Sequence, residues 1–307
     1  MKNYLFTICI IIAVAISMAF PQYFIEINGF PLKKLIIPLL QIIMFGMGTT
    51  MSWGDFLAVV KTPKAVIVGL ICQFTIMPLV GFTLANVFSF PNEIAAGIVL
   101  IGCSPSGLAS NVMAYIAKAN VALSITITSI ATLLAPILTP ALMKLLAGQF
   151  IDISFWSMMQ DILKMIIFPI ILGLIVNKIL GKNINVLNRI LPVISMAGIA
   201  FIIVIITAAG RDSLLSIGGI LIFAVLIHNI LGYFLGYWGG KLFGLNEQSC
   251  RTIAIEVGLQ NAGLASGLAL QMGKVATVGL AAALFGPIMN TSGSLLATWW
   301  GKRPPLN

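Results

Sequence analysis

One acidic residue lies where a charge is costly. The sequence has only eight Asp and Glu residues, and Glu256 lies inside the apolar segment 247–272, within the run IAIEVGLQNAG. A carboxylate at the centre of a bilayer costs about 2.5 to 3.5 kcal/mol on insertion scales. Arg251 lies five residues nearer the start of the segment, and no Lys or Arg lies at comparable depth. A proton or a bound cation must therefore compensate Glu256.

The neighbours of Glu256 favour a cation with oxygen ligands. Gln260 and Asn261 offer amide oxygens, which are hard neutral ligands. Gly258 and Gly263 let a helix unwind and turn its backbone carbonyls inward. We therefore interpret the region as a Na⁺ site, with a protonated Glu256 packed against a polar neighbour as the alternative.

A second segment shows matching features. Residues 93–117 contain Pro105, which removes one backbone hydrogen bond, and Gly107, which loosens the next turn. Two broken helices at equivalent places are the sequence pointer to a transporter's binding site. Ser124 and Thr128 lie four residues apart and share one helical face. Gln73 and Asn290 are further polar residues in apolar runs, which either join helices or belong to a site. We interpret His228 and Asn229, in the segment 214–243, as polar groups that pack between helices.

The composition requires lipid around these segments. Of 307 residues 60% are hydrophobic and 8% are charged, and the mean hydropathy is +1.10. A soluble domain keeps roughly a quarter of its residues charged. A spanning helix needs about 20 apolar residues. We expect an all-α polytopic membrane protein with ten spans, near 4–20, 34–52, 64–88, 93–117, 120–147, 155–180, 189–209, 214–243, 247–272 and 275–299.

The same composition excludes other classes of protein. The net charge of +9 comes from cations between the apolar segments, so we expect no nucleic-acid partner. The four cysteines, including Cys103, are single and form no CxxC pair. No nucleophile with a base, phosphate loop or zinc motif is present, so an enzyme is not expected. We take the apolar run after Lys2 as an uncleaved first span.

Loop charges predict that both termini are cytoplasmic. The cations assigned to the cytoplasmic side are Lys2, Lys61, Lys64, Lys118, Lys178, Lys182, Arg189, Lys241, Arg251, Lys302 and Arg303. Those assigned to the outside are Lys33, Lys34, Lys144, Arg211 and Lys274, and Lys164 falls within a span.

The two halves of the chain are expected to be inverted repeats. Residues 1–149 hold the first five spans and residues 150–307 the second five, and an odd number per half reverses the orientation. The run GLAS at 107–110 recurs at 263–266, in the fourth span of each half.

At these residues the chain resembles the bile acid:sodium symporter family, in particular its bacterial members. The resemblance runs over nearly the whole length. It is carried by SNV at 110–112, YIAK at 115–118, VALS at 121–124, EVGLQN at 256–261 and NTSGS at 290–294.

The resemblance implies a panel domain (spans one, two, six and seven), a core domain (spans three to five and eight to ten) and crossing broken helices four and nine. It also implies two co-transported Na⁺ ions. The first would be held by Ser110, Asn111, Ser124, Thr128 and Glu256. The second would be held by Gln73, Glu256, Gln260 and the backbone carbonyls of Val257 and Leu259. An organic anion would bind near the crossing, beside Leu108, Ala109, Asn261, Met289 and Asn290.

Two departures from the family pattern concern the substrate. Leu108 stands where many bacterial members have Thr, and Met289 where they have His, so the cleft is less polar. A bile acid-like molecule or a small carboxylate such as pantoate fits equally. We expect a monomer in the bacterial inner membrane that works by alternating access. A proton-coupled antiporter using Glu256, an arsenite-type exporter using Cys103, and a channel or membrane sensor are the alternatives.

Overall fold

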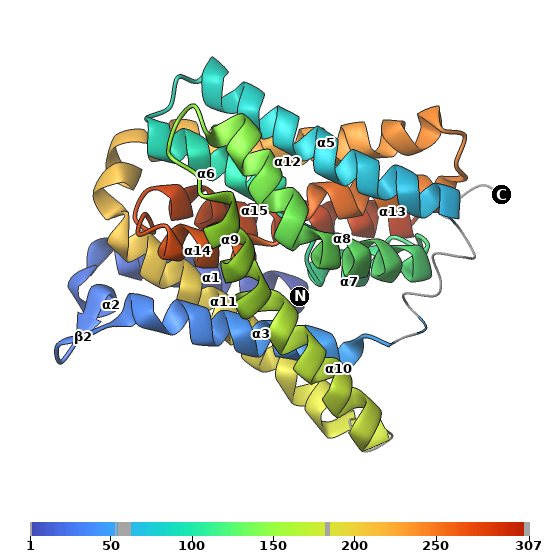
Figure 1. Ribbon diagram of the computed structural model, residues 1–307, viewed down its shortest axis with the longest axis horizontal. Helices are drawn as coiled ribbons and strands as arrows, with labels where there is room; N and C mark the ends of the chain where they lie inside the picture. Colours follow the sequence, from blue (N-terminus) through green and yellow to red (C-terminus); the bar gives the residue numbers. More distant parts are fainter. Residues whose placement is uncertain (1, 53, 55–62, 182–184, 304–307) are drawn as a thin grey trace.

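The computed structural model describes residues 2–52, 54, 63–181 and 185–303 and is almost entirely helical (Figure 1). Among these residues six helices are long and apolar enough to cross a membrane. They are Leu32–Thr50, Pro63–Val87, Val121–Ala147, Phe155–Leu180, Arg211–Leu242 and Val278–Gly301. Lys61 and Lys182, two of the cations used to predict orientation, lie outside the described residues. A helical membrane protein is confirmed, and the count of ten spans stays a prediction.

Helices of the first half match the predicted segments within a few residues. They are α1 (Lys2–Ala19), α3 (Ile36–Thr50), α5 (Pro63–Val87), α6 (Asn92–Cys103), α7 (Ala109–Ile116) and α8 (Val121–Leu142), which continues as a π-helical turn, η3 (Met143–Ala147). The second half has α9 (Phe155–Ile162), a π-helical turn η4 (Leu163–Ile167), α10 (Phe168–Leu180), α11 (Asn185–Ala209), α12 (Arg211–Leu242), α13 (Glu247–Gly258), α14 (Ala262–Gln271) and α15 (Val278–Gly301).

A short hairpin before α3 was not predicted. It follows the short helix α2 (Gln22–Ile25) and pairs β1 (Glu26–Ile27) with β2 (Phe30–Pro31), before a 3-10 turn, η1 (Leu32–Leu35). Asn28 and Gly29 form its turn with φ of 49° and 79°. Asn-Gly is the favoured pair where both turn residues need positive φ. The Asn28-Gly29 pair in the sequence therefore indicated a hairpin turn at this position.

The helices pack in two groups. Helix α3 packs on α10 and α11, and α11 also packs on α1. Helix α12 packs on α5, α13 and α15, and α6 packs on α5 and α15. These groups contain the segments assigned to panel and core, whose division stays a prediction together with the halves 1–149 and 150–307.

Glycines let α12 approach α13 closely. A Cβ on Gly236 would lie 3.1 Å from the Cα of Ala254, and one on Gly240 would lie 3.1 Å from the Cα of Cys250. Small residues at a four-residue spacing are the usual means by which membrane helices bring their backbones together. This close packing holds α13, the helix that carries Glu256, against α12.

Candidate ion and substrate site

Two interrupted helices meet inside the molecule. Residues 104–108 separate α6 from α7, and residues 259–261 separate α13 from α14. Ser106 and Gln260 form an isolated antiparallel bridge, and the amide N of Asn261 donates to the carbonyl of Pro105 at 2.8 Å. A Cβ on Gly107 would lie 3.4 Å from the carbonyl oxygen of Gln260. The two breaks therefore satisfy each other's backbone groups in the interior, where no water can do so.

Both breaks lie in the segments where the sequence predicts them, and the second, 259–261, falls between Gly258 and Gly263. Pro105 and Gly107 lie in the first break, as expected. The expectation that Gly263 unwinds is wrong, because Gly263 lies in the first turn of α14. A Cβ there would lie 3.1 Å from Leu40 of α3, so Gly263 provides close packing instead.

The carboxylate of Glu256 is fully buried among hydroxyl groups. Its Oε2 accepts from Ser106 Oγ at 2.5 Å and from Thr128 Oγ1 at 2.8 Å, and its Oε1 accepts from Ser124 Oγ. Among the described residues no Lys, Arg or His forms an ion pair with it. The buried acid therefore has hydrogen-bond donors but no protein countercharge.

The cluster around Glu256 contains more acceptors than protons. Ser124 Oγ also lies 2.9 Å from Oδ1 of Asn111, and its single proton can serve only one of the two oxygens. Ser110 Oγ lies 3.2 Å from Thr128 Oγ1 but donates to the carbonyl of Gly107 at 2.8 Å. A cation or an added proton would relieve this excess of oxygen lone pairs.

The structure thus brings together all five residues of the first predicted sodium site, Ser110, Asn111, Ser124, Thr128 and Glu256. Ser106 belongs to the same cluster and was missed. Ser106 lies between Pro105 and Gly107, and this position inside the predicted helix break could have indicated that it belongs to the site. A serine there could equally bond its own backbone, which is why the sequence did not select it.

The second predicted site is brought together in part. Gln73 Nε2 donates to Gln260 Oε1 at 2.9 Å and to the carbonyl of Ser104 at 3.0 Å. Gln260 Nε2 donates to the carbonyl of Val257 at 2.6 Å, so that carbonyl is already bonded. Leu259 is fully buried in the break. In the described part of the chain the hydrogen bonds of Glu256 reach the first cluster and not Gln73 or Gln260.

One atom of the second cluster is unsatisfied. Gln73 Oε1 is buried and has no hydrogen-bond partner among the residues that the structure describes. A buried acceptor without a partner costs about 1–3 kcal/mol, so such an atom is uncommon unless something else binds it. It is a free oxygen ligand beside the helix crossing.

The five residues predicted to contact the substrate lie on three elements. Leu108 and Ala109 are half-buried at the start of α7, and Asn261 caps α14 by accepting from Leu264 N at 3.0 Å. Met289 is buried in α15, and Asn290 Nδ2 donates to the carbonyl of Gly286 in the same helix at 2.8 Å. Among the described residues no hydrogen bond joins these side chains to one another, so their role stays a prediction.

Polar groups of α12 hold the end of α13. Asn229 Nδ2 donates to the carbonyl of Gly258 at 2.8 Å, and its Oδ1 accepts from Ser292 Oγ at 2.5 Å. His228 Nε2 lies 2.9 Å from the carbonyl of Met77. Both side chains are fully buried and join neighbouring helices, which agrees with the packing interpretation.

Thiol ligation has little support. Cys72, Cys103 and Cys250 are buried free cysteines, and no group of three or more His, Cys, Asp or Glu side chains that could hold a metal ion occurs among the described residues. The arsenite-type alternative therefore rests on the single thiol of Cys103, which is fully buried.

Comparison with known proteins agrees with the resemblance. The Sodium Bile acid symporter family matches residues 37–217. The chain is 42% identical over 298 residues to the "Uncharacterized sodium-dependent transporter YocS" of Bacillus subtilis, covering 97% of this chain and 91% of that protein. It is 32% identical over 266 residues to the "Probable sodium/metabolite cotransporter BASS1, chloroplastic" of Arabidopsis thaliana, covering 87% of this chain and 66% of the plant protein. A similar match is the BASS1 cotransporter of Oryza sativa subsp. japonica, at 30% identity over 98% of this chain and 73% of that protein.

These relatives are named as transporters and not as enzymes, so the expectation of a transporter is confirmed. The family match ends at residue 217, before Glu256, whereas the similarity to the Bacillus protein spans nearly the whole chain. The chain belongs to the sodium bile acid symporter family.

Proposed function

We propose that the protein imports an organic anion together with two Na⁺ ions. The observation that carries this proposal is the fully buried carboxylate of Glu256, ringed by hydroxyl and amide oxygens. A cation at this point would neutralise the charge and bind several hard oxygen ligands at once. The "sodium-dependent" and "sodium/metabolite" names of the relatives support Na⁺ as that cation.

The first Na⁺ would bind among Ser110, Asn111, Ser124, Thr128 and Glu256, with Ser106 as an additional ligand. Hydroxyl hydrogens rotate easily, so Ser106, Ser124 and Thr128 can turn their lone pairs from the carboxylate toward an ion. The second Na⁺ would bind at Gln73, Gln260 and the carbonyls of Val257 and Leu259. The unpartnered Oε1 of Gln73 supports this position.

Transport would proceed by alternating access of the core against the panel. Ten spans result if α1, α6 with α7, α11, and α13 with α14 cross the bilayer in addition to the six long apolar helices. In Figure 1 the hairpin β1–β2 lies at the left end of the molecule, and α13 lies towards the right. Inverted halves, cytoplasmic termini and a monomer in the bacterial inner membrane belong to the same proposal, which rests on the loop charges and on an odd number of spans in each half.

The substrate would be a monovalent organic anion beside Asn261 and Asn290, near the start of α7. The N-terminal ends of α7 and α14 would favour its negative charge. Two Na⁺ with one anion carry a net charge of +1, which the membrane potential drives by about 2.3 kcal/mol per 100 mV. Uptake into proteoliposomes should therefore increase when the interior is made negative.

The experiment is uptake by purified protein in proteoliposomes with imposed gradients. An inward Na⁺ gradient should drive accumulation of pantoate, a keto acid or a bile acid, and an equal K⁺ gradient should not. Uptake that follows a pH gradient without Na⁺ would instead favour a proton-coupled antiporter. Solute flow that neither saturates nor depends on Na⁺ would favour a channel.

A further inference from the structure

A buried arginine lies on the same helix as Glu256, outside the sites described above. Arg251 was assigned to a cytoplasmic loop, but in the structure it lies inside α13 with only 6% of its side chain exposed. It is the single Lys or Arg that is buried among those whose burial the structure describes. A buried cation needs partners to offset its desolvation.

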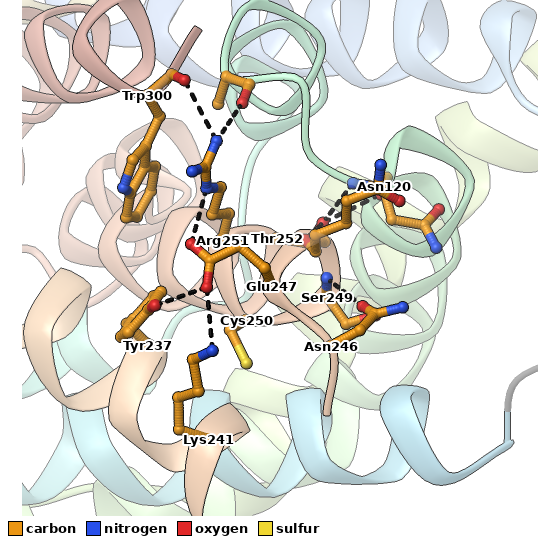
Figure 2. Close-up of polar contacts among 12 residues, drawn as sticks. Asn120, Tyr237, Lys241, Asn246, Glu247, Ser249, Cys250, Arg251, Thr252 and Trp300 are labelled. Carbon is orange, nitrogen blue, oxygen red and sulfur yellow. Dashed lines mark hydrogen bonds and ion pairs between the residues drawn. The ribbon is translucent and has the colours of Figure 1, made fainter. Parts of the chain in front are cut away.

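Those partners come from three helices. Arg251 Nε donates to Glu247 Oε1 at 2.9 Å within α13. Its Nη1 donates to the carbonyl of Ala117, which ends α7, at 3.3 Å and to the carbonyl of Trp300, in the last turn of α15, at 3.1 Å. The guanidinium also lies 5.6 Å from the centroid of the Trp300 ring (Figure 2). One side chain thus donates to carbonyls at the ends of two helices, where a positive charge is favourable.

The next residue ties α13 to a fourth element. Thr252 Oγ1 accepts from the backbone N of Asn120 at 2.9 Å and lies 3.1 Å from its carbonyl (Figure 2). Asn120 is the N-cap of α8. Both contacts fasten α13 to the chain between α7 and α8, the two helices that carry the other ligands of the first cluster.

The spacing connects these contacts to the ion site. Thr252 and Glu256 are four residues apart on α13, and so are Asn120 and Ser124 at the start of α8. The pair Asn120–Thr252 therefore lies one helical turn from the pair Ser124–Glu256. Any slip of α13 along α8 would change both pairs together.

We propose that Arg251 and Thr252 are positioning residues for sodium binding. They hold α13 in register with α7 and α8, so that the oxygens of Ser110, Asn111 and Ser124 face Glu256 at the distances an ion requires. This inference rests on the proposed function, because it assumes that the cluster binds Na⁺. In the described part of the chain, the hydrogen bonds of Arg251 and Thr252 go to groups outside the cluster.

The test compares the sodium response of matched variants. The melting temperature of purified protein is measured across a NaCl series, with KCl keeping the ionic strength constant. Fitting the logarithmic rise of stability with Na⁺ gives the concentration that half-saturates the folded protein. Arg251→Gln and Thr252→Val should raise this concentration about tenfold, equal to about 1.4 kcal/mol of binding free energy. Arg251→Lys should lie between them and the parent protein, because a single ammonium nitrogen can pair with Glu247 or donate to the two carbonyls but cannot occupy both positions at once.

Arg303→Gln is the control. Arg303 stacks on the neighbouring Trp299 at 4.4 Å, is exposed, and should leave the half-saturating concentration unchanged. If Arg251→Gln does not fold, Thr252→Val decides the question.

Two results would overturn the proposal, and they differ from each other. Variants that melt at a lower temperature in KCl but keep the parental half-saturating concentration would show a role in stability alone. A parent protein that Na⁺ does not stabilise would refute the proposed sodium binding, and the positioning role with it.

Discussion

Replacing Glu256 by glutamine removes the buried charge while keeping the shape of the side chain. In the structure the carboxylate contacts the hydroxyls of Ser106, Ser124 and Thr128. A glutamine oxygen can accept from the same hydroxyls, and its amide can donate to hydroxyls that rotate. The cluster can therefore stay satisfied without the charge.

The Glu256→Gln substitution should weaken sodium binding but should not destabilise the sodium-free protein. A unit charge about 4 Å from a cation contributes about 4 kcal/mol at an effective dielectric of 20, so sodium affinity should fall about a thousandfold. The sodium-free protein no longer buries a charge whose cost is about 2.5 to 3.5 kcal/mol near mid-bilayer. Glu256→Gln should therefore melt at or above the parental temperature in KCl and show no stabilisation by NaCl.

Thermal melts of the purified parent and variant in NaCl and KCl series measure both effects. Asp212→Asn is the matched control, because it makes the same acid-to-amide change at a side chain that is 97% exposed. It should keep the parental sodium response. A Glu256→Gln protein whose half-saturating Na⁺ concentration stays within threefold of the parent, or whose melting temperature in KCl collapses, would refute the reasoning.

Two further substitutions test the surroundings of the site. Gly258→Ala places a Cβ 2.2 Å from the ring of Tyr233, so it should destabilise the protein by about 1–3 kcal/mol. Gly219→Ala, within α12, is the control, because nothing lies within 4 Å of its added Cβ and the change should not lower the melting temperature. Gln73→Leu removes the free Oε1 and should reduce saturable binding of radioactive sodium from two ions to one. Two bound ions in Gln73→Leu would contradict the placement of the second site.

Glu256 could be singled out from the sequence because a charge in an apolar segment has few possible explanations, whereas the set of residues around it was implied by the family resemblance. Glu256 has no cation at its depth in the sequence, and the structure surrounds it with Ser110, Asn111, Ser124 and Thr128. Pro105 likewise predicted an interruption because it cannot donate a backbone hydrogen bond.

Other features depended on three-dimensional contacts that periodicity does not reveal. Arg251 follows a loop and looked like an ordinary orienting charge, but carbonyls at the ends of α7 and α15 surround it. Asn229 gave no sign that it would bond Gly258 at the end of α13. Gly263 was expected to break its helix, yet the break falls before it because Asn261 caps α14.

The measurement that tests the central claim most directly is equilibrium binding of radioactive sodium to the purified protein, with Glu256→Gln alongside. We predict saturable binding of two ions per chain in the parent and none in the variant at the same concentrations. Absence of saturable binding in the parent, or equal binding in both proteins, would contradict a cation site at Glu256.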